Sequence, residues 1–579
     1  MPLVSKTFDQ LLDFTRTSAA TFVGSNGLIQ TTPASVNLLT WTQQFDNAVW
    51  TKNAITVTAN TTVAPDGTST ADTVTESATN DLHAAFQTST LTALTTHTIS
   101  AYVRAGTRSF AMLRVGGGGF TTGPAIKASL TGAGSTTTIE GPVVSSAITS
   151  VGGGWYRVSM TFVSTATTAG YAPQIGPHNN GSAVTYLGDG SGIFIWGAQL
   201  EAASAASTYT RNNGGVFPPR FDYDPVTLAA KGLLIEEQRT NLQTYSEDFT
   251  NAIWTSATLT IAANSTASPD GTVNADTGTR TTTGVTENMR RATTAQAIST
   301  TYTVTVYVKA NTAGARLYMR NLAVDNTATT GVVQFNPADG TVSTTYGSTY
   351  VGKATMTAAG NGWYRCSITG TTGGTIANNF IDIGVTDGTS AVGGNAANSV
   401  FIWGAQLEAG AFATSYIPTV ASQVTRTADS CAIVAPNFSP WYNQSEGTFV
   451  VEADGPAIGT QILTQADDNT ANNRITARFS AATSAMVVVT AASGVVALSQ
   501  GLVVANTPAK VAIAYKQNDC ALSFNGTAPA LDTLATMPTV SRLGIGTNAS
   551  NLEALNGHIR SIRYYPTRLT NAQLQALTA

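Results

Sequence analysis

The sequence contains few charged residues and no excess of either sign. Only 11% of its 579 residues are charged, with 29 Lys and Arg against 33 Asp and Glu and a net charge of −4, whereas an average soluble domain has roughly 25% charged residues. No run of Lys or Arg occurs, which argues against nucleic-acid binding, because such proteins gain affinity by neutralising phosphates. Hydrophobic residues make up 42% of the chain, so the low charge does not indicate disorder.

Cysteine and histidine are also scarce. The three cysteines, Cys366, Cys431 and Cys520, are an odd number without motif spacing, which argues against a disulfide framework and favours buried thiols in a protein made in a reducing cytoplasm. The four histidines form no metal-binding or catalytic motif, and neither residue type clusters as a zinc site requires. The sequence therefore predicts neither a zinc site nor a recognisable catalytic centre.

Long apolar runs are missing as well. No stretch approaches the ~20 apolar residues of a membrane helix, and the first ten residues lack the apolar segment of a signal peptide. We therefore expect no membrane insertion and no secretion by the usual route.

A long internal duplication is the main feature that the sequence does contain. The segment NLLTWTQQFDNAVWT from Asn37 is matched by NLQTYSEDFTNAIWT from Asn241, and Trp50 and Trp254 are 204 residues apart. Seven such blocks recur in the same order, with offsets between 204 and 208 residues. The drift falls between the blocks, where turns absorb insertions, so the chain carries two copies of one domain.

Both copies have the sequence pattern of β-strands. Segments such as HTISAYVRA and YTVTVYVKA alternate apolar and polar residues and are rich in β-branched and aromatic side chains. Turn clusters such as APDGT separate them, and Asp66-Gly67 and Asp270-Gly271 are typical of type I or I′ turns. From about Thr427 the chain also reads as strands, except for a helix near 569–577 that Thr570 is placed to cap.

The chain also contains the phrases FTRTSAATFVGSNGLIQT, PRFDYDPVTLAAKGLLIEEQRTNL and FIWGAQLEAGAFATSYIPT. These phrases resemble a family of bacteriophage and prophage virion proteins, the tail-fibre, spike or receptor-binding proteins with carbohydrate-binding-module-like sandwiches. The stretch from SPWYNQSEGTF onward resembles the concanavalin A-like or laminin G-like jelly roll that ends such proteins. In related chains the first phrase runs almost directly into the second. The first sandwich is therefore expected to be an inserted duplicate, with 20–32 and 216–238 close together.

The predicted fold is all-β, with three β-sandwich or jelly-roll domains in series, the first two an internal duplication, plus a short N-terminal attachment element. The expected parts are an N-terminal attachment segment at 1–36, a first sandwich at 37–211, a connector at 212–240 that packs with the N-terminal segment, a second sandwich at 241–426, and a concanavalin A-like or laminin G-like sandwich at 427–579.

The resemblance implies a structural protein of the phage particle, made in the host cytoplasm, whose sandwiches bind host-surface polysaccharide. Multivalent display raises avidity without any strong single site. Two alternatives stay open: a purely architectural virion protein without glycan binding, and a polysaccharide-degrading tailspike. We expect no enzyme activity, contacts with other virion proteins through the N-terminal segment, and a homo-oligomer, with a trimer favoured.

Sugar modules stack aromatic rings on pyranose faces, so exposed aromatic residues are the candidate ligand contacts. The tryptophans that occur in both copies sit in alternating strands and are expected to fill the core. Better candidates lie near loops that differ between the copies, or follow a proline in the third domain: Trp41, Phe120, Tyr171, Tyr186, Tyr245, Trp441 and Tyr442.

No cofactor is required by any motif. Sandwich modules of this resemblance often carry one structural Ca²⁺, bound by carbonyls and a few carboxylates. The carboxylates placed to contribute are Asp72, Glu201, Asp276 and Glu408. Their alternative role is to pair with neighbouring arginines at the surface.

Overall fold

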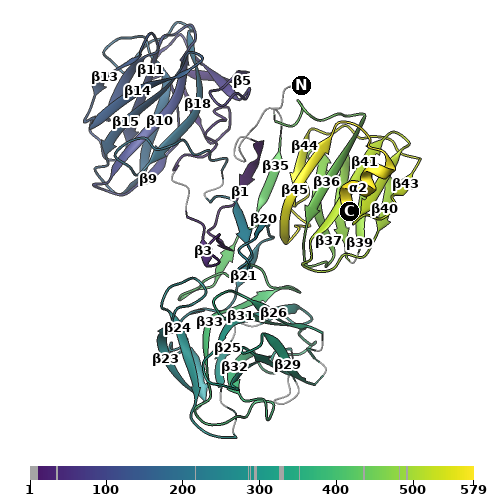
Figure 1. Cartoon of the computed structure of the whole chain (residues 1–579). Coiled ribbons are helices and arrows are strands. Elements are labelled where there is room, and N and C mark those ends of the chain that lie inside the picture. The colour runs from purple at the N-terminus through teal and green to yellow at the C-terminus, as the bar shows by residue number, and fades with distance from the viewer. Residues whose placement is uncertain are drawn as a thin grey trace.

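The protein is all-β and contains three sandwiches that meet at a central junction (Figure 1). The computed structural model describes residues 11–33, 37–214, 217–257, 259–284, 286, 288–292, 296–324, 331–347, 349–350, 352–434, 437–481, 483–490 and 493–579. No helix in these ranges is long and apolar enough to cross a membrane. Thr570 caps helix α2 (Asn571–Thr578) by accepting from the Gln573 backbone N–H, which confirms the predicted cap.

The first sandwich is built from two antiparallel sheets. One has the order β14-β15-β10-β18-β6-β5, and the other has the order β13-β12-β11-β16-β8-β4. Its strands are β4 (Thr51–Asn53), β5 (Ile55–Thr62), β6 (Ala71–Glu76), β7 (Asn80–Asp81), β8 (Ala84–Phe86), β9 (Ser89–Leu91), β10 (Thr96–Ala105), β11 (Phe110–Gly117), β12 (Ala125–Ser129), β13 (Ser135–Glu140), β14 (Ser145–Gly152), β15 (Trp155–Val163), β16 (Thr168–Pro177), β17 (Tyr186–Leu187) and β18 (Gly192–Glu201).

The second sandwich repeats this plan strand for strand. Its sheets have the orders β30-β31-β26-β33-β24-β23 and β29-β28-β27-β32-β25-β22. Its strands are β21 (Arg239–Asn241), β22 (Trp254–Ala257), β23 (Leu259–Thr266), β24 (Ala275–Arg280), β25 (Asn288–Ala292), β26 (Thr301–Ala310), β27 (Arg316–Asn321), β28 (Val332–Asn336), β29 (Thr341–Tyr346), β30 (Ala354–Ala358), β31 (Trp363–Thr371), β32 (Phe380–Thr386), β33 (Ser399–Ala409) and β34 (Val424–Arg426).

The repeated sequence blocks account for the shared geometry of the two copies. Every paired tryptophan is buried, as the strand pattern predicts: Trp50, Trp155, Trp196, Trp254, Trp363 and Trp403. In the repeated IWGAQLE motif, Gly197 and Gly404 have φ of 61° and 65° and lie beside register shifts in the ladder. A Cβ on Gly197 would come within 2.9 Å of the Tyr102 ring, so this bulge requires glycine.

The C-terminal sandwich contains strands from the N-terminal segment (1–36) and from the connector (212–240), and we call it the composite sandwich. Its sheets have the orders β1-β35-β44-β37-β38-β39-β40 and β19-β20-β45-β36-β41-β42-β43. Its strands are β1 (Asp13–Thr15), β19 (Arg220–Tyr223), β20 (Ala230–Ile235), β35 (Ser430–Ile433), β36 (Glu446–Ala453), β37 (Thr460–Asp467), β38 (Arg474–Ser480), β39 (Thr483–Thr490), β40 (Ser493–Gln500), β41 (Ala509–Lys516), β42 (Cys520–Phe524), β43 (Ala530–Asp532), β44 (Arg542–Ile545) and β45 (Gly557–Tyr565).

The other two sandwiches are therefore insertions into this composite sandwich. The ends of the first insertion meet where Asn212 Nδ2 donates to the Asn37 carbonyl (3.1 Å). The ends of the second meet in the ladder between β21 and β34. The hairpin of β2 (Thr21–Val23) and β3 (Ile29–Thr31) contacts the connector 212–240, where the Val23 N–H donates to Asp222 (2.6 Å).

A buried network of charged side chains closes the junction between these segments. Asp429 accepts from Arg16 (2.8 Å) and Arg220 (2.5 Å), and also from the backbone N–H of Glu236 (2.9 Å). The side chains of Arg16, Arg220 and Asp429 are 0% exposed. Asp429, which directly precedes β35, thus joins the N-terminal segment and the connector 212–240 to the C-terminal part of the chain.

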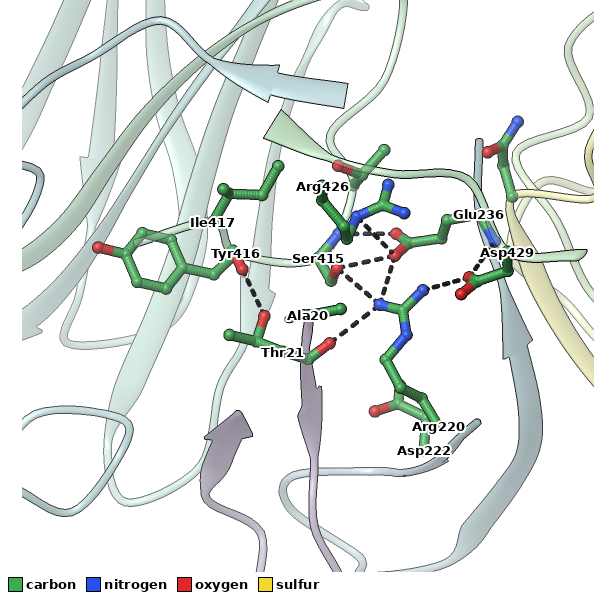
Figure 2. Close-up of polar contacts among 12 residues, drawn as sticks. Ala20, Thr21, Arg220, Asp222, Glu236, Ser415, Tyr416, Ile417, Arg426 and Asp429 are labelled. Atoms are coloured by element: carbon green, nitrogen blue, oxygen red, sulfur yellow. Dashed lines mark hydrogen bonds and ion pairs between the residues drawn. The ribbon is translucent and has the colours of Figure 1, made fainter. Parts of the chain in front are cut away.

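Glu236 is the second carboxylate of this network (Figure 2). It accepts from Arg220 (2.7 Å) and from both the backbone N–H and the hydroxyl of Ser415 (2.7 Å each), and Arg426 lies 3.5 Å away. Arg220 also donates to the Thr21 carbonyl (3.0 Å). Burial alone would raise the pKa of Glu236, but Arg426, Arg220 and Ser415 lower it below the usual value. Both carboxylates are therefore matched by arginines, as buried charges must be.

His558 forms a second polar link between the connector and the sandwich. Its Nε2 lies 2.9 Å from Asp222 on β19, and its Nδ1 lies 2.7 Å from Asp454, next to β36. Burial by itself would lower the pKa of His558, but the hydrogen bonds with both carboxylates raise it, against the opposing charge of Lys231. Arg560 also faces Asp454 (3.6 Å). His558 therefore binds Asp222 and Asp454 more strongly when its imidazole is protonated than when it is neutral.

We predict that Asp429→Asn destabilises the composite sandwich by about 3 to 5 kcal/mol, because it leaves buried arginines without their carboxylate. Hydrogen exchange of β36 and β41 amides measures this loss. As a control, Glu140→Gln breaks the partly exposed pair with Arg114 (2.9 Å) and is expected to cost about 0 to 1 kcal/mol. Equal effects of the two variants would contradict the role given to Asp429.

We predict that the composite sandwich loses stability as the pH rises above neutrality. A raised pKa in the folded state means that protonated His558 contributes fully below its unfolded pKa of about 6.5, and that this contribution disappears as the pH rises through the folded pKa. Urea unfolding at about pH 6 and about pH 9 should show this loss, and His558→Gln should abolish it. His97→Gln, in the first sandwich, is the control and should leave the loss unchanged.

Candidate functional site

The strongest candidate site is the outer face of one sheet in the second sandwich. Met289, Met319 and Ile383, on strands β25, β27 and β32, point into the core. Because side chains alternate along a strand, Arg290 and Asp382 lie on the opposite, outer face, as does Arg320 on β27. The ladder places these three residues side by side, since Asp382 pairs with Arg290 on one neighbouring strand and with Arg320 on the other.

Asp382 holds the two arginines in fixed positions. Arg290 donates to it through Nε (2.7 Å) and Nη2 (2.9 Å), and Arg320 donates through Nε (2.6 Å). The side chain of Asp382 is 0% exposed and that of Arg320 is 6% exposed, whereas Arg290 is 39% exposed. Its hydrogen bonds with Asp382 raise the pKa of Arg290, against its partial burial. The triad has two positive charges and one negative charge, and presents the Arg290 guanidinium to solvent.

A second row of residues lies beside the triad. Asn288 pairs with Gly384 and Gly384 with Tyr318 across the three strands of the triad, and Tyr318 pairs with Gln334 on the next strand, β28. Within the described part of the chain, Asn288 Nδ2 and Gln334 Oε1 are buried without a hydrogen-bond partner. A buried polar group without a partner costs about 1 to 3 kcal/mol. Both side chains are buried, and Gln334 also donates to the Ser390 carbonyl of the loop that covers it (2.6 Å), so these two groups suit a bound water rather than direct contact with a ligand.

An aromatic ring borders the exposed arginine. The Arg290 guanidinium lies 5.1 Å from the centre of the partly exposed Phe380 ring, in cation–π geometry. A planar guanidinium beside a ring can bind a hydroxyl-rich ligand. The described carboxylate of this face, Asp382, is occupied by two guanidinium groups, which does not suit it to proton transfer. The arrangement suits binding.

The first sandwich carries different residues at two of the three equivalent positions, those of Arg290 and Asp382, and keeps an arginine at the third. The row corresponding to the triad contains Phe86, Gln174 and Arg114. Arg114 donates to Gln174 (3.0 Å) and is neutralised by Glu140 (2.9 Å). The duplicated scaffold therefore keeps its core and its strand order while this outer face differs in charge and hydrogen-bonding groups.

Three of the aromatic residues predicted to contact sugar are buried, so their rings are unavailable for stacking. Tyr171 is 0% exposed, and its hydroxyl bonds to the backbone of Ala166. Tyr186 is 6% exposed and donates to Glu76 (2.6 Å), and Tyr442 belongs to the core of the composite sandwich. Tyr171 and Tyr186 lie in strands β16 and β17, and their burial depends on packing that the sequence pattern does not reveal.

The other four aromatic candidates are partly exposed but are spread over all three sandwiches. Trp41 and Tyr245 occupy the same position in the two copies, each with φ near 50° and a carbonyl that accepts from the indole of Trp50 or Trp254. Phe120 packs on Tyr171, and Trp441 packs on Phe438 and Tyr564. The structure does not bring these four rings together into one site.

The carboxylates proposed for Ca²⁺ do not fit one shared ion. Asp72 accepts from the backbone N–H groups of Phe45 (2.8 Å) and Asn60 (2.9 Å), and Asp276 accepts from the equivalent groups in the second copy. Burial raises the pKa of Asp72 to about 6, against those hydrogen bonds. Asp72 pairs with Ile195, so Glu201 lies roughly 20 Å further along β18.

Glu201 and Glu408 have protein partners of their own. Glu201 accepts from Gln199 (2.7 Å) and from the Ser207 N–H (3.0 Å), while Glu408 accepts from the Thr414 N–H (3.1 Å) and hydroxyl. No group of three potential ligands for a metal ion occurs in the described ranges. These four carboxylates instead fix loops and a β-bulge within each sandwich.

The residues of the candidate face were missed in the sequence because they lie outside the repeated blocks. Arg290, Arg320 and Asp382 belong to three strands, and their contact depends on the order in which these strands pair. One signal was present: charged residues at alternate strand positions in a chain with 11% charge. Position-by-position comparison of the two copies would have shown that Phe86 and Gln174 stand where Arg290 and Asp382 stand.

No protein-family model and no curated protein sequence matches the chain. Among solved structures, it is similar to the CBM40 of the Ruminococcus gnavus IT-sialidase bound to α2,3-sialyllactose, with 15% identity over 25% of this chain and 89% of that chain (TM-score 0.22). The CBM22-1–CBM22-2 tandem of Paenibacillus barcinonensis Xyn10C is 9% identical over 66% of this chain and 100% of that chain (TM-score 0.23). Domains LG4-5 of the mouse laminin α1 chain are 10% identical over 49% of this chain and 88% of that chain (TM-score 0.19). The likeness is confined to β-sandwich architecture.

We predict that removing Ca²⁺ leaves the two duplicated sandwiches unchanged in stability, because the four carboxylates already have protein donors. Thermal unfolding with EDTA and with added Ca²⁺ checks this, with a difference below roughly 2 °C expected. A larger rise in Tm with Ca²⁺, lost in Asp72→Asn or Asp276→Asn, would show that an ion does bind there.

Proposed function

We propose that the chain is a non-catalytic virion protein of a bacteriophage whose sandwiches bind host-surface polysaccharide. The observation that carries the glycan-binding part is the outer face of the second sandwich, where the Arg290 guanidinium is 39% exposed and lies beside the partly exposed Phe380 ring. A scaffold present twice, with one face changed and the core kept, is typical of modules that differ in ligand rather than in fold.

The chemistry of that face suits a sugar. Saccharides offer hydroxyl groups that accept hydrogen bonds and an apolar C–H face, which match a fixed guanidinium and an aromatic ring. The chain as a whole is poor in charge, so neutral hydrogen bonding dominates the rest of its surface chemistry. Binding through such contacts is weak at each site, and several modules on one particle would raise the avidity.

The virion role rests on the resemblance of the connector phrases to phage proteins. In this proposal the protein contacts other virion proteins through its N-terminal segment and forms a homo-oligomer, with a trimer favoured because such particles are symmetric. Residues 13–32 are part of the junction and of the composite sandwich. The attachment role is therefore tested by removing residues 1–10, which spares β1 and Arg16.

Arg290→Gln should weaken binding of the intact protein to host polysaccharide by about tenfold, because a charge-assisted hydrogen bond contributes about 1.5 to 3 kcal/mol. Glycan arrays and binding to host cells measure the change. The control is Lys353→Gln, which removes a positive charge from an exposed residue of the same sandwich.

Two results would contradict this proposal. The absence of glycan and host-cell binding by the wild-type protein would favour the purely architectural alternative. Release of reducing ends from host polysaccharide would instead favour a tailspike hydrolase.

A further inference from the structure

The composite sandwich has a groove on the outer face of the sheet that contains β37 and β38. The groove has a volume of about 280 Å³ and is lined by both strands and by the loop 548–553. Odd-numbered residues of β38 point into the core, so Arg474, Thr476 and Arg478 share the outer face. This site is separate from the face of the second sandwich, since the two lie on different domains.

Hydrogen bonds fix the loop that forms one wall of the groove. Asn548 Oδ1 accepts from the backbone N–H groups of Ser550 (3.0 Å) and Leu552 (2.9 Å), and Asn548 Nδ2 donates to Glu553 (3.1 Å). The N–H of Ile462 on β37 donates to the Glu553 carbonyl (3.0 Å). The groove is therefore preformed, which lowers the entropy cost of binding a ligand.

The lining of the groove contains two arginines and one carboxylate, Glu553, so its net charge is positive. Many arginines of this chain pair with a carboxylate or lie over an aromatic ring, but neither contact is found for Arg474 or Arg478 among the described residues. The Nε of Arg478 is buried without a hydrogen-bond partner. The acidic residue of the lining, Glu553, accepts instead from Asn548.

We infer that this groove binds an acidic saccharide through its carboxylate groups. A guanidinium matches a carboxylate through two parallel hydrogen bonds, and two arginines four residues apart on one strand lie roughly 13 Å from each other, which suits a chain with repeated acidic units. Leu552, 64% exposed on the rim, offers an apolar contact for sugar C–H groups.

A saccharide fits this groove better than an acidic peptide. Peptides that bind to sheets usually add a strand to a free edge. Here β38 pairs with β37 on one side and with β39 on the other, so its backbone hydrogen bonds are already used. Only side chains are available to the ligand.

Isothermal titration calorimetry of the full chain at low salt tests the inference, with tetragalacturonate as the acidic probe and its methyl ester as the uncharged match. We expect the acid to bind and the ester to bind at least tenfold more weakly. The double variant Arg474→Gln with Arg478→Gln should lose about tenfold or more of the affinity for the acid. The matched control, Arg563→Gln, changes an exposed arginine on the other sheet and should leave the affinity unchanged.

The outcomes also separate this site from the one in the second sandwich. Arg290→Gln should leave tetragalacturonate binding intact, so failure of either proposal does not decide the other. The inference is overturned if wild type does not bind tetragalacturonate, if the ester binds equally well, if the double variant binds like wild type, or if a poly-glutamate peptide binds more tightly than the saccharide.

Discussion

The buried pairing of Asp429 and Glu236 with arginines is the interaction on which the arrangement of the three sandwiches depends. A carboxylate removed from water is tolerated only when cations and hydrogen-bond donors surround it. Asp429 obtains them from Arg16 and Arg220, residues more than 200 positions apart in the sequence. Because each partner comes from a different segment, the network forms only when all of these segments have reached the junction together.

This constraint explains how a chain with so few charges accommodates two large insertions. Each inserted sandwich leaves and re-enters the junction at neighbouring points, through Asn37 and Asn212 in one case and through β21 and β34 in the other. Each inserted sandwich can therefore fold without changing the backbone of the composite sandwich. One copy could then diverge on its outer face, where Arg290 and Asp382 replace Phe86 and Gln174, while buried positions such as Trp254 kept the role of Trp50.

Local features were predictable because their causes are local. The alternation of strands, the Thr570 cap and the Asp66-Gly67 turn depend on residues within a few positions of each other, and the structure has all three. The aromatic candidates were less predictable. Tyr171 and Phe120 lie near the same loop and contact each other, yet one is buried and the other partly exposed, a difference that the sequence pattern does not reveal.

The sequence by itself determined the all-β fold, the duplication and the burial of the paired tryptophans, because strand periodicity and repeated blocks depend on residues that are close together in the sequence. Only the tertiary structure decided that β1, β19 and β20 belong to the C-terminal sandwich, since their ladder partners lie hundreds of residues away. It also decided which polar residues form the candidate sites. Arg290 meets Asp382 across a ladder, and Arg474 and Arg478 face a loop some 70 residues further on, because strand order and loop packing set these contacts.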